Sequence, residues 1–259
     1  MTDRTVSKAK ADLPPLHPTA LTVGAWRDLR EVFPRFWPLW IVWSIYGAGS
    51  IYWEHSVSTG QGLTSPVGLA YLAVSSMVVA VLSGAATRGL LGGATPWWTL
   101  DARLGRYVIL MGSGNFLLQA PALVQSADRA HLNAANAGGV MLLSLLQLVI
   151  LIVFLWAAVR LLLWPIGQLD EGGEMTARKS WRQMRGAFWP YFGASILAGG
   201  GPAIVTVALL FQFQQHGALW GLIAQAPLAG LMGLIFAAVT VQIYRTRVTG
   251  PDKLAEVFD

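Results

Sequence analysis

Histidine and acidic side chains are the first candidates for chemistry, because the chain has four histidines and no cysteine. No two histidines stand at the spacing of metal ligands along one helix. Three of them and two carboxylates nevertheless fall in loops that the sequence places on one side of a membrane. These residues are His55, His131, His216, Glu54 and Asp128. They either converge to bind a divalent metal or are simply the polar residues that short loops need, and we assign no metal.

Catalytic motifs are missing from the sequence. The lack of cysteine excludes disulfides, thiolate nucleophiles, cysteine-ligated zinc and iron–sulfur clusters. The sequence contains no glycine loop followed by lysine of the phosphate-binding type, no H-E-x-x-H and no G-x-S-x-G. We therefore predict a protein that is not an enzyme, with no catalytic residues and no cofactor.

Uncharged polar residues inside the apolar segments are the remaining candidates. The segments that we predict to cross the membrane carry no buried Asp, Glu, Lys or Arg, which argues against ion-coupled transport. Their notable polar residues are Asn115, Gln119, Gln147 and Gln225. These side chains either form hydrogen bonds between helices or line a path for a neutral solute. Prolines at 121, 202 and 227 predict kinks, which suit packing and transport equally.

The composition indicates that transmembrane helices position these residues. Of 259 residues 54% are hydrophobic and only 12% charged, whereas soluble domains have about a quarter charged. Six long uncharged segments predict an all-α polytopic membrane protein with six transmembrane helices. The spans are expected near 36–53, 66–86, 107–125, 139–160, 190–213 and 219–243. Residues 23–245 then form the membrane domain, residues 1–22 a disordered cytoplasmic N-terminus and residues 246–259 a cytoplasmic tail.

The distribution of Lys and Arg predicts the orientation. With these spans, every Lys and Arg except Arg129 falls on one side of the membrane. Basic residues near span ends stay in the cytoplasm, so we predict a bacterial inner-membrane protein with both termini cytoplasmic. The basic residues flank apolar segments, so the net charge of +5 predicts anionic lipid headgroups, and not nucleic acid, as partners.

Basic segments before three of the spans resemble one another. Residues 26–33 and 181–188 both read W-R-x-x-R-x-x-F, and a looser version precedes the third span. They predict either three repeated hairpins, each led by a basic interfacial helix, or chance likeness from the usual bias of Arg and Trp at interfaces. Prolines at 34 and 190 are expected to break the helix where it turns into the membrane. The predicted headgroup or partner contacts are Arg27, Arg30, Arg103, Arg106, Arg178, Lys179, Arg182 and Arg185, and the interfacial anchors are Trp26, Trp97, Trp98, Trp181 and Trp189.

One region also carries a family resemblance. R-L-L-L-W-P at 160–165, an acidic stretch at 170–174 and A-R-K-S-W-R-Q-M-R-G-A-F-W-P-Y-F-G at 177–193 resemble a bacterial six-helix membrane family. That family includes the membrane domain that precedes some glycerophosphoryl diester phosphodiesterases. Residues 103–107 are similar to the approach to its third span. The resemblance implies a standalone member without the catalytic barrel, so it implies no activity.

These observations lead to two functional hypotheses. The first is a non-catalytic membrane module that binds lipid or partner proteins or forms homo-oligomers, which the Arg and Trp segments favour. The alternative is a transporter or channel for a small neutral or amphipathic solute, which the kinks and the Asn115/Gln119 face favour.

Overall fold

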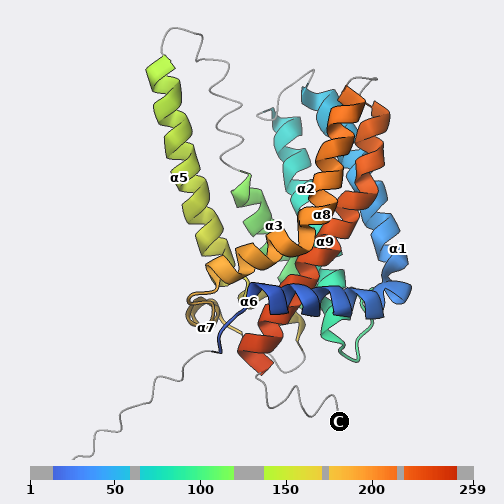
Figure 1. The fold of residues 1–259 in the computed structure, drawn as a ribbon, viewed down its shortest axis with the longest axis vertical. Helices are drawn as coiled ribbons and strands as arrows, with labels where there is room; N and C mark the ends of the chain where they lie inside the picture. Colours follow the sequence, from blue (N-terminus) through green and yellow to red (C-terminus); the bar gives the residue numbers. More distant parts are fainter. Residues whose placement is uncertain (1–13, 59–64, 120–136, 171–174, 215–218, 250–259) are drawn as a thin grey trace, which may run out of the picture.

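The computed structural model describes residues 14–58, 65–119, 137–170, 175–214 and 219–249, and within these ranges it is helical and has no strand (Figure 1). The elements are α1 (Pro18–Ser58), α2 (Pro66–Leu91), α3 (Ala102–Leu118), α5 (Ala137–Leu161), α6 (Leu163–Leu169), α7 (Ala177–Gln183), α8 (Phe188–Gln214), α9 (Leu219–Tyr244) and the π-helix η1 (Arg245–Thr249).

Within the described ranges, four helical stretches are long and apolar enough to cross a membrane. They are Pro66–Leu91, Leu148–Leu169, Phe188–Leu209 and Ala224–Val248. The structure is therefore that of a helical membrane protein. The two other expected spans are helical, but α1 is rich in Trp, Tyr and Gly, which lower its hydropathy, and α3 has 17 residues.

The expected spans at 66–86, 139–160, 190–213 and 219–243 agree with α2, α5, α8 and α9. At the charged end α2 continues to Leu91, and the stretches long enough to cross the membrane include Arg88, Arg160 and Arg245. Arg88, two residues beyond the expected span 66–86, is 3% exposed, whereas Arg160 and Arg245 are partly exposed.

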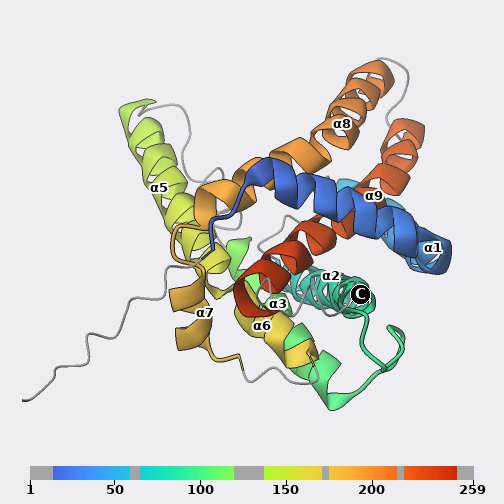
Figure 2. The ribbon, with the colours of Figure 1, turned by 60° about the horizontal axis from the view of Figure 1, so that its bottom comes forward.

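Helix α1 contradicts the expected break at Pro34. It is one helix of 41 residues that contains both Pro34 and Pro38, so the basic segment and the first expected span are continuous. In Figures 1 and 2 its first part, the basal arm, runs across the foot of the molecule before the helix turns upward. Proline removes one backbone hydrogen bond and bends a helix without ending it when tertiary contacts hold both sides.

Contacts of the basal arm show that it crosses α8 and α9. Thr22 Oγ1 lies 3.3 Å from the carbonyl oxygen of Ala194 in α8, and a Cβ on Gly24 would lie 2.8 Å from the side chain of Gln242 in α9. Leu16 in the core and the helix from Pro18 lie within the range 1–22 that was expected to be disordered, and η1 continues past residue 245.

The two W-R-x-x-R-x-x-F segments have different backbones. Residues 26–33 lie within the unbroken α1, whereas in residues 181–188 the helix α7 ends at Gln183 and α8 starts at Phe188. Gly186 lies between them with φ 75°, a conformation that favours glycine. The shared sequence pattern therefore does not produce a shared local structure, and the expected repeat is not confirmed.

Helix α9 forms the centre of the fold and packs against α1, α8 and α2. Its glycines allow close approach to α1: a Cβ on Gly230 would lie 2.9 Å from Ser44 Oγ, and Gly233 faces the ring of Trp43. Trp40 Nε1 donates a hydrogen bond to the carbonyl of Pro227 at 2.9 Å. Small residues at such contacts are the usual basis of helix association in membranes.

Helix α5 is separated from this centre. Figures 1 and 2 both show it standing away from the upper parts of α2, α8 and α9, with its lower end near α7. It contacts α7 and also α3, α8 and α6.

Candidate functional site at the charged base

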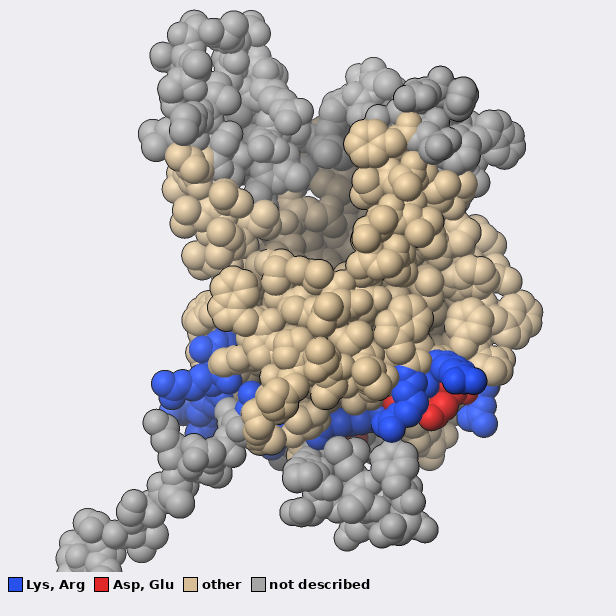
Figure 3. Space-filling model, viewed as in Figure 1, with Lys and Arg blue, Asp and Glu red and all other residues tan. Residues whose placement is uncertain are grey.

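Lys and Arg side chains gather in one band at the foot of the helices (Figure 3). We call the exposed ones the basic belt; they are Arg27, Arg30, Arg35, Arg103, Arg106, Arg178, Lys179, Arg182 and Arg185. Among the acidic side chains whose burial the structure describes, only Glu31 is exposed. All eight predicted headgroup contacts belong to the belt. It comes from the basal arm of α1, the start of α3, and α7 with the turn that follows it.

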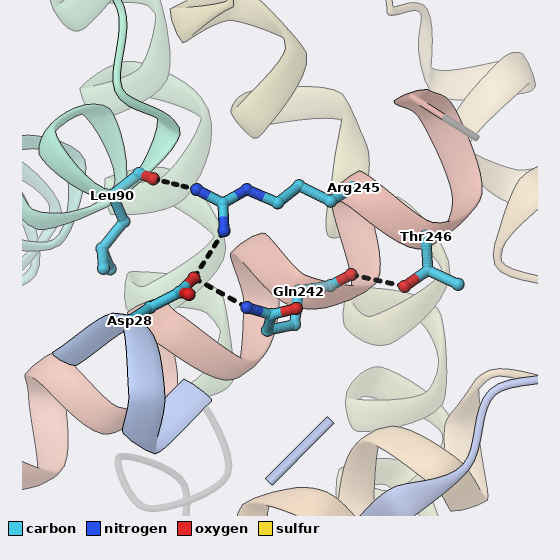
Figure 4. A network of polar contacts seen from close by, with 5 residues as sticks. All are labelled: Asp28, Leu90, Gln242, Arg245 and Thr246. Carbon is cyan, nitrogen blue, oxygen red and sulfur yellow. Dashed lines mark hydrogen bonds and ion pairs between the residues drawn. The ribbon is translucent and has the colours of Figure 1, made fainter. Parts of the chain in front are cut away.

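Acidic residues at the same level point inward. Asp28 on the basal arm is only 7% exposed and accepts hydrogen bonds from Gln242 Nε2 at 2.7 Å and from Arg245 Nη1 at 2.5 Å (Figure 4). Arg245 Nη2 also donates to the carbonyl oxygen of Leu90, in the last turn of α2. Such carbonyls have no partner within their own helix. Arg245, at the start of η1, therefore joins α1 through the ion pair and α2 through the hydrogen bond.

A second ion pair fixes the connection from α2 to α3. Arg88 is 3% exposed; its Nη2 lies 2.6 Å from Asp101 Oδ1 and its Nη1 donates to the carbonyl of Thr99 at 2.6 Å. Asp101 is also the N-cap of α3 and accepts from Leu104 N at 2.8 Å. Burial alone raises the pKa of Asp101, but the Leu104 N–H and the Arg88 guanidinium outweigh it and lower that pKa below its ordinary value. The carboxylate therefore stays ionised at neutral pH.

A third acid, Asp170, follows α6. Its Oδ2 accepts a hydrogen bond from Tyr244 Oη at 2.7 Å, which joins the end of α6 to α9. Four residues of the two ion pairs, Asp28, Arg88, Asp101 and Arg245, were not predicted from the sequence. Only Asp101 had a usable local signal, since an Asp three residues before an apolar helical position is typical of an N-cap.

Arg160, near the end of α5, lies between two indoles. Its guanidinium carbon is 5.0 Å from the ring centroid of Trp156 and 5.5 Å from that of Trp181, and the two rings meet edge to face at 5.1 Å. Nη1 donates to the carbonyl of Trp181 at 2.9 Å, and Ser180 Oγ donates to the carbonyl of Arg160 at 2.9 Å. The spacing of Trp156 and Arg160, four residues on one helix, was an available signal.

The predicted tryptophan anchors divide into two kinds. Trp26, Trp98, Trp181 and Trp189 are exposed. Trp97 instead packs against the hydrophobic core, with its ring edge to face against Phe36 at 6.0 Å. Trp97 is thus a packing residue, and its neighbour Trp98 is the exposed one.

Three of the four predicted intramembrane polar residues have described side chains. Gln119, the C-cap of α3, donates from Nε2 to Ser76 Oγ of α2 at 3.2 Å, which is a bond between helices. Asn115 in α3 is partly buried, and Gln225 is buried in α9. The side chain of Gln147 is outside the described part. Gln119 is thus used in one of the two ways expected, as a hydrogen bond between helices.

The predicted outward metal cluster lies beyond what the structure describes. Glu54 and His55 are in α1 without described side chains, and Asp128, His131 and His216 are outside the described ranges. In the part of the chain that is described, no group of three or more His, Asp or Glu is placed to hold a metal ion.

Comparison with known proteins adds no relative: no family model, no curated protein and no solved structure matches the chain. The resemblance to the phosphodiesterase membrane domain remains a prediction. The function must therefore be inferred from the geometry of the base.

Proposed function

We propose that the protein is a non-catalytic module of the bacterial inner membrane that binds anionic phospholipid through the basic belt on its cytoplasmic face. One observation carries this proposal: the belt has nine exposed basic side chains, with Glu31 as the described exposed acid. Each basic residue near an anionic surface contributes about 1 kcal/mol, so a belt of this size distinguishes anionic from neutral lipid.

The internal ion pairs support this function. Asp28, Asp101 and Asp170 all accept hydrogen bonds from other parts of the fold. Because these acids are used inside, the charge that the described residues of the base present outward is mostly positive. Exposed tryptophans beside the belt suit the depth of the headgroups, and a basal arm that crosses the foot of the helices suits the membrane surface.

The proposal includes six spans and cytoplasmic termini. The upper part of α1 packs along α9, and α3 packs along α2, so both run beside helices that are long enough to cross. Six crossings also keep the belt on one side of the membrane, as the positive-inside rule requires.

Single cysteines test this topology without background labelling, since the chain has none. A membrane-impermeant maleimide should label His216→Cys in spheroplasts, and should label Lys179→Cys only after the membrane is permeabilised. Labelling of both variants from the same side contradicts six spans.

The lipid function is tested with two matched variants of the belt. Arg27, Arg30, Arg103 and Arg106 are all replaced by Gln in one variant and by Lys in the other. Each variant is purified in detergent, and its binding of phosphatidylglycerol and of phosphatidylcholine is compared at low and high salt. We expect the Gln variant to lose at least tenfold of the preference for phosphatidylglycerol and the Lys variant to keep most of it, with high salt reducing both. An unchanged preference in the Gln variant contradicts the proposed function.

The transporter alternative gains no specific support. Gln119, one of the two residues that suggested a polar face, donates its amide to Ser76. Tyr46 and Ser75, on α1 and α2, likewise bond to each other at 2.6 Å. Polar side chains between these helices serve the contact between them.

A further inference from the structure

Helix α5 is exposed on every side over residues 148–154. The seven consecutive residues 148–154 are each between 38% and 57% exposed. An α-helix has 3.6 residues per turn, so seven residues pass almost twice around its circumference. The side that faces the other helices is therefore uncovered as well, and Figure 3 shows the molecule hollowed beside α5, with uncharged residues on the visible wall.

The foot of this hollow is basic. Arg160 lies on α5 between the rings of Trp156 and Trp181. Among the described residues its Nη1 has an acceptor, the carbonyl of Trp181. The Arg160 side chain is partly exposed.

Further positive charge surrounds this foot. α7 packs against α5 through the bond from Ser180 to Arg160 and carries exposed Arg178, Lys179 and Arg182. Asp170, the described acid in the segment that joins α5 to α7, is bonded to Tyr244. Among the described residues, the foot is therefore positively charged and the exposed side chains of α5 above it are apolar.

We propose that the hollow beside α5 holds one anionic phospholipid, with its phosphate on Arg160 and its acyl chains along α5. A guanidinium presents parallel N–H donors that match phosphate oxygens, and the flanking indoles hold its plane. The exposed apolar residues from Leu145 to Trp156 provide a surface about 16 Å long, enough for most of an acyl chain. The inference rests on the proposed function for its ligand class and adds a defined site.

The test measures lipid retention by native mass spectrometry. Full-length protein in detergent is loaded with phosphatidylglycerol, and Arg160→Gln is compared with wild type and with Lys253→Gln, which removes an equal charge outside the belt. We expect one lipid per chain on wild type and Lys253→Gln, and at least tenfold lower occupancy on Arg160→Gln. Equal occupancy of Arg160→Gln and Lys253→Gln overturns the site.

Three controls distinguish this lipid site from a misfolded variant, a free phosphate site and a dimer contact. Arg160→Lys should retain more lipid than Arg160→Gln, because it keeps the charge, and circular dichroism should show all three variants folded. Inorganic phosphate should not displace the lipid; displacement overturns the proposal in favour of a phosphate site. A lipid-free dimer that Leu151→Arg dissociates would overturn it by showing that a second copy covers α5.

The two proposals fail separately. The belt experiment leaves Arg160 unchanged. The retention experiment leaves unchanged the four arginines that the belt experiment replaces, Arg27, Arg30, Arg103 and Arg106. A protein that retains the lipid at Arg160 but shows no overall preference for phosphatidylglycerol contradicts only the belt. A protein that shows this preference but retains no lipid at Arg160 contradicts only this site.

Discussion

Helices α5 and α9 have 25 and 26 residues and are both strongly apolar, yet they have opposite surroundings. In α9 residues 234, 235 and 237–241 are at most 7% exposed. In α5 residues 148–154 are all exposed. Hydropathy thus predicts that a helix lies in the membrane, but it does not predict whether protein or lipid surrounds it.

The size of the side chains explains the difference. α9 places Gly230 and Gly233 against Ser44 and Trp43 of α1, so the two backbones approach closely. In α5 residues 148–155 are Leu, Val, Ile and Phe without a small residue. Lipid chains are as apolar as these side chains, so association in the membrane depends on packing, and α5 offers no groove for a neighbour.

The sharpest test of this comparison truncates one leucine in each helix. Leu234→Ala in α9 removes a fully buried side chain and should lower the free energy of unfolding by about 2–4 kcal/mol. Leu151→Ala in α5, the same change at an exposed position, should lower it by less than about 1 kcal/mol. Unfolding in mixed SDS micelles measures both, and equal losses would show that α5 is packed against protein.

A smaller effect is expected at the foot of α9. Asp28→Asn weakens the bond to Arg245 and should cost about 1–3 kcal/mol, because Arg245 is partly exposed and water replaces some of the lost interaction. Glu31→Gln, three residues along the same helix on an exposed side chain, should change stability by less than about 0.5 kcal/mol. The same SDS titration measures both, and equal effects would mean that the buried acid does not hold the basal arm.

Helix bounds were largely predictable, because an uncharged stretch of the right length must leave water. The continuity of α1 through Pro34 and Pro38 was not, since it depends on contacts at Ala194 and Gln242 far along the chain. A local rule treats each proline by itself and predicts a break.

The candidate site was predictable only in its exposed part. All eight predicted basic contacts are exposed. A charged side chain beside an apolar segment usually stays in water, because burying it without a partner is costly. The buried ion pairs were missed because hydropathy counts each charge by itself. Asp28 and Arg88 can be buried because each is paired with an opposite charge. Arg160 was interpreted only as the end of a span. Its contact with Trp181 was not predicted, because Trp181 lies in α7, well beyond the end of α5.

The ion pair between Asp28 and Arg245 joins residues 217 positions apart. During synthesis the basal arm emerges early, and its carboxylate meets its partner only after α9 has left the ribosome and entered the bilayer. Until then Asp28 lacks its Arg245 partner and should stay hydrated, because a lone carboxylate is costly to bury. The ion pair at the base therefore forms late in synthesis. A nascent chain that stops before α9 has a basal arm whose Asp28 lacks both Gln242 and Arg245 as partners.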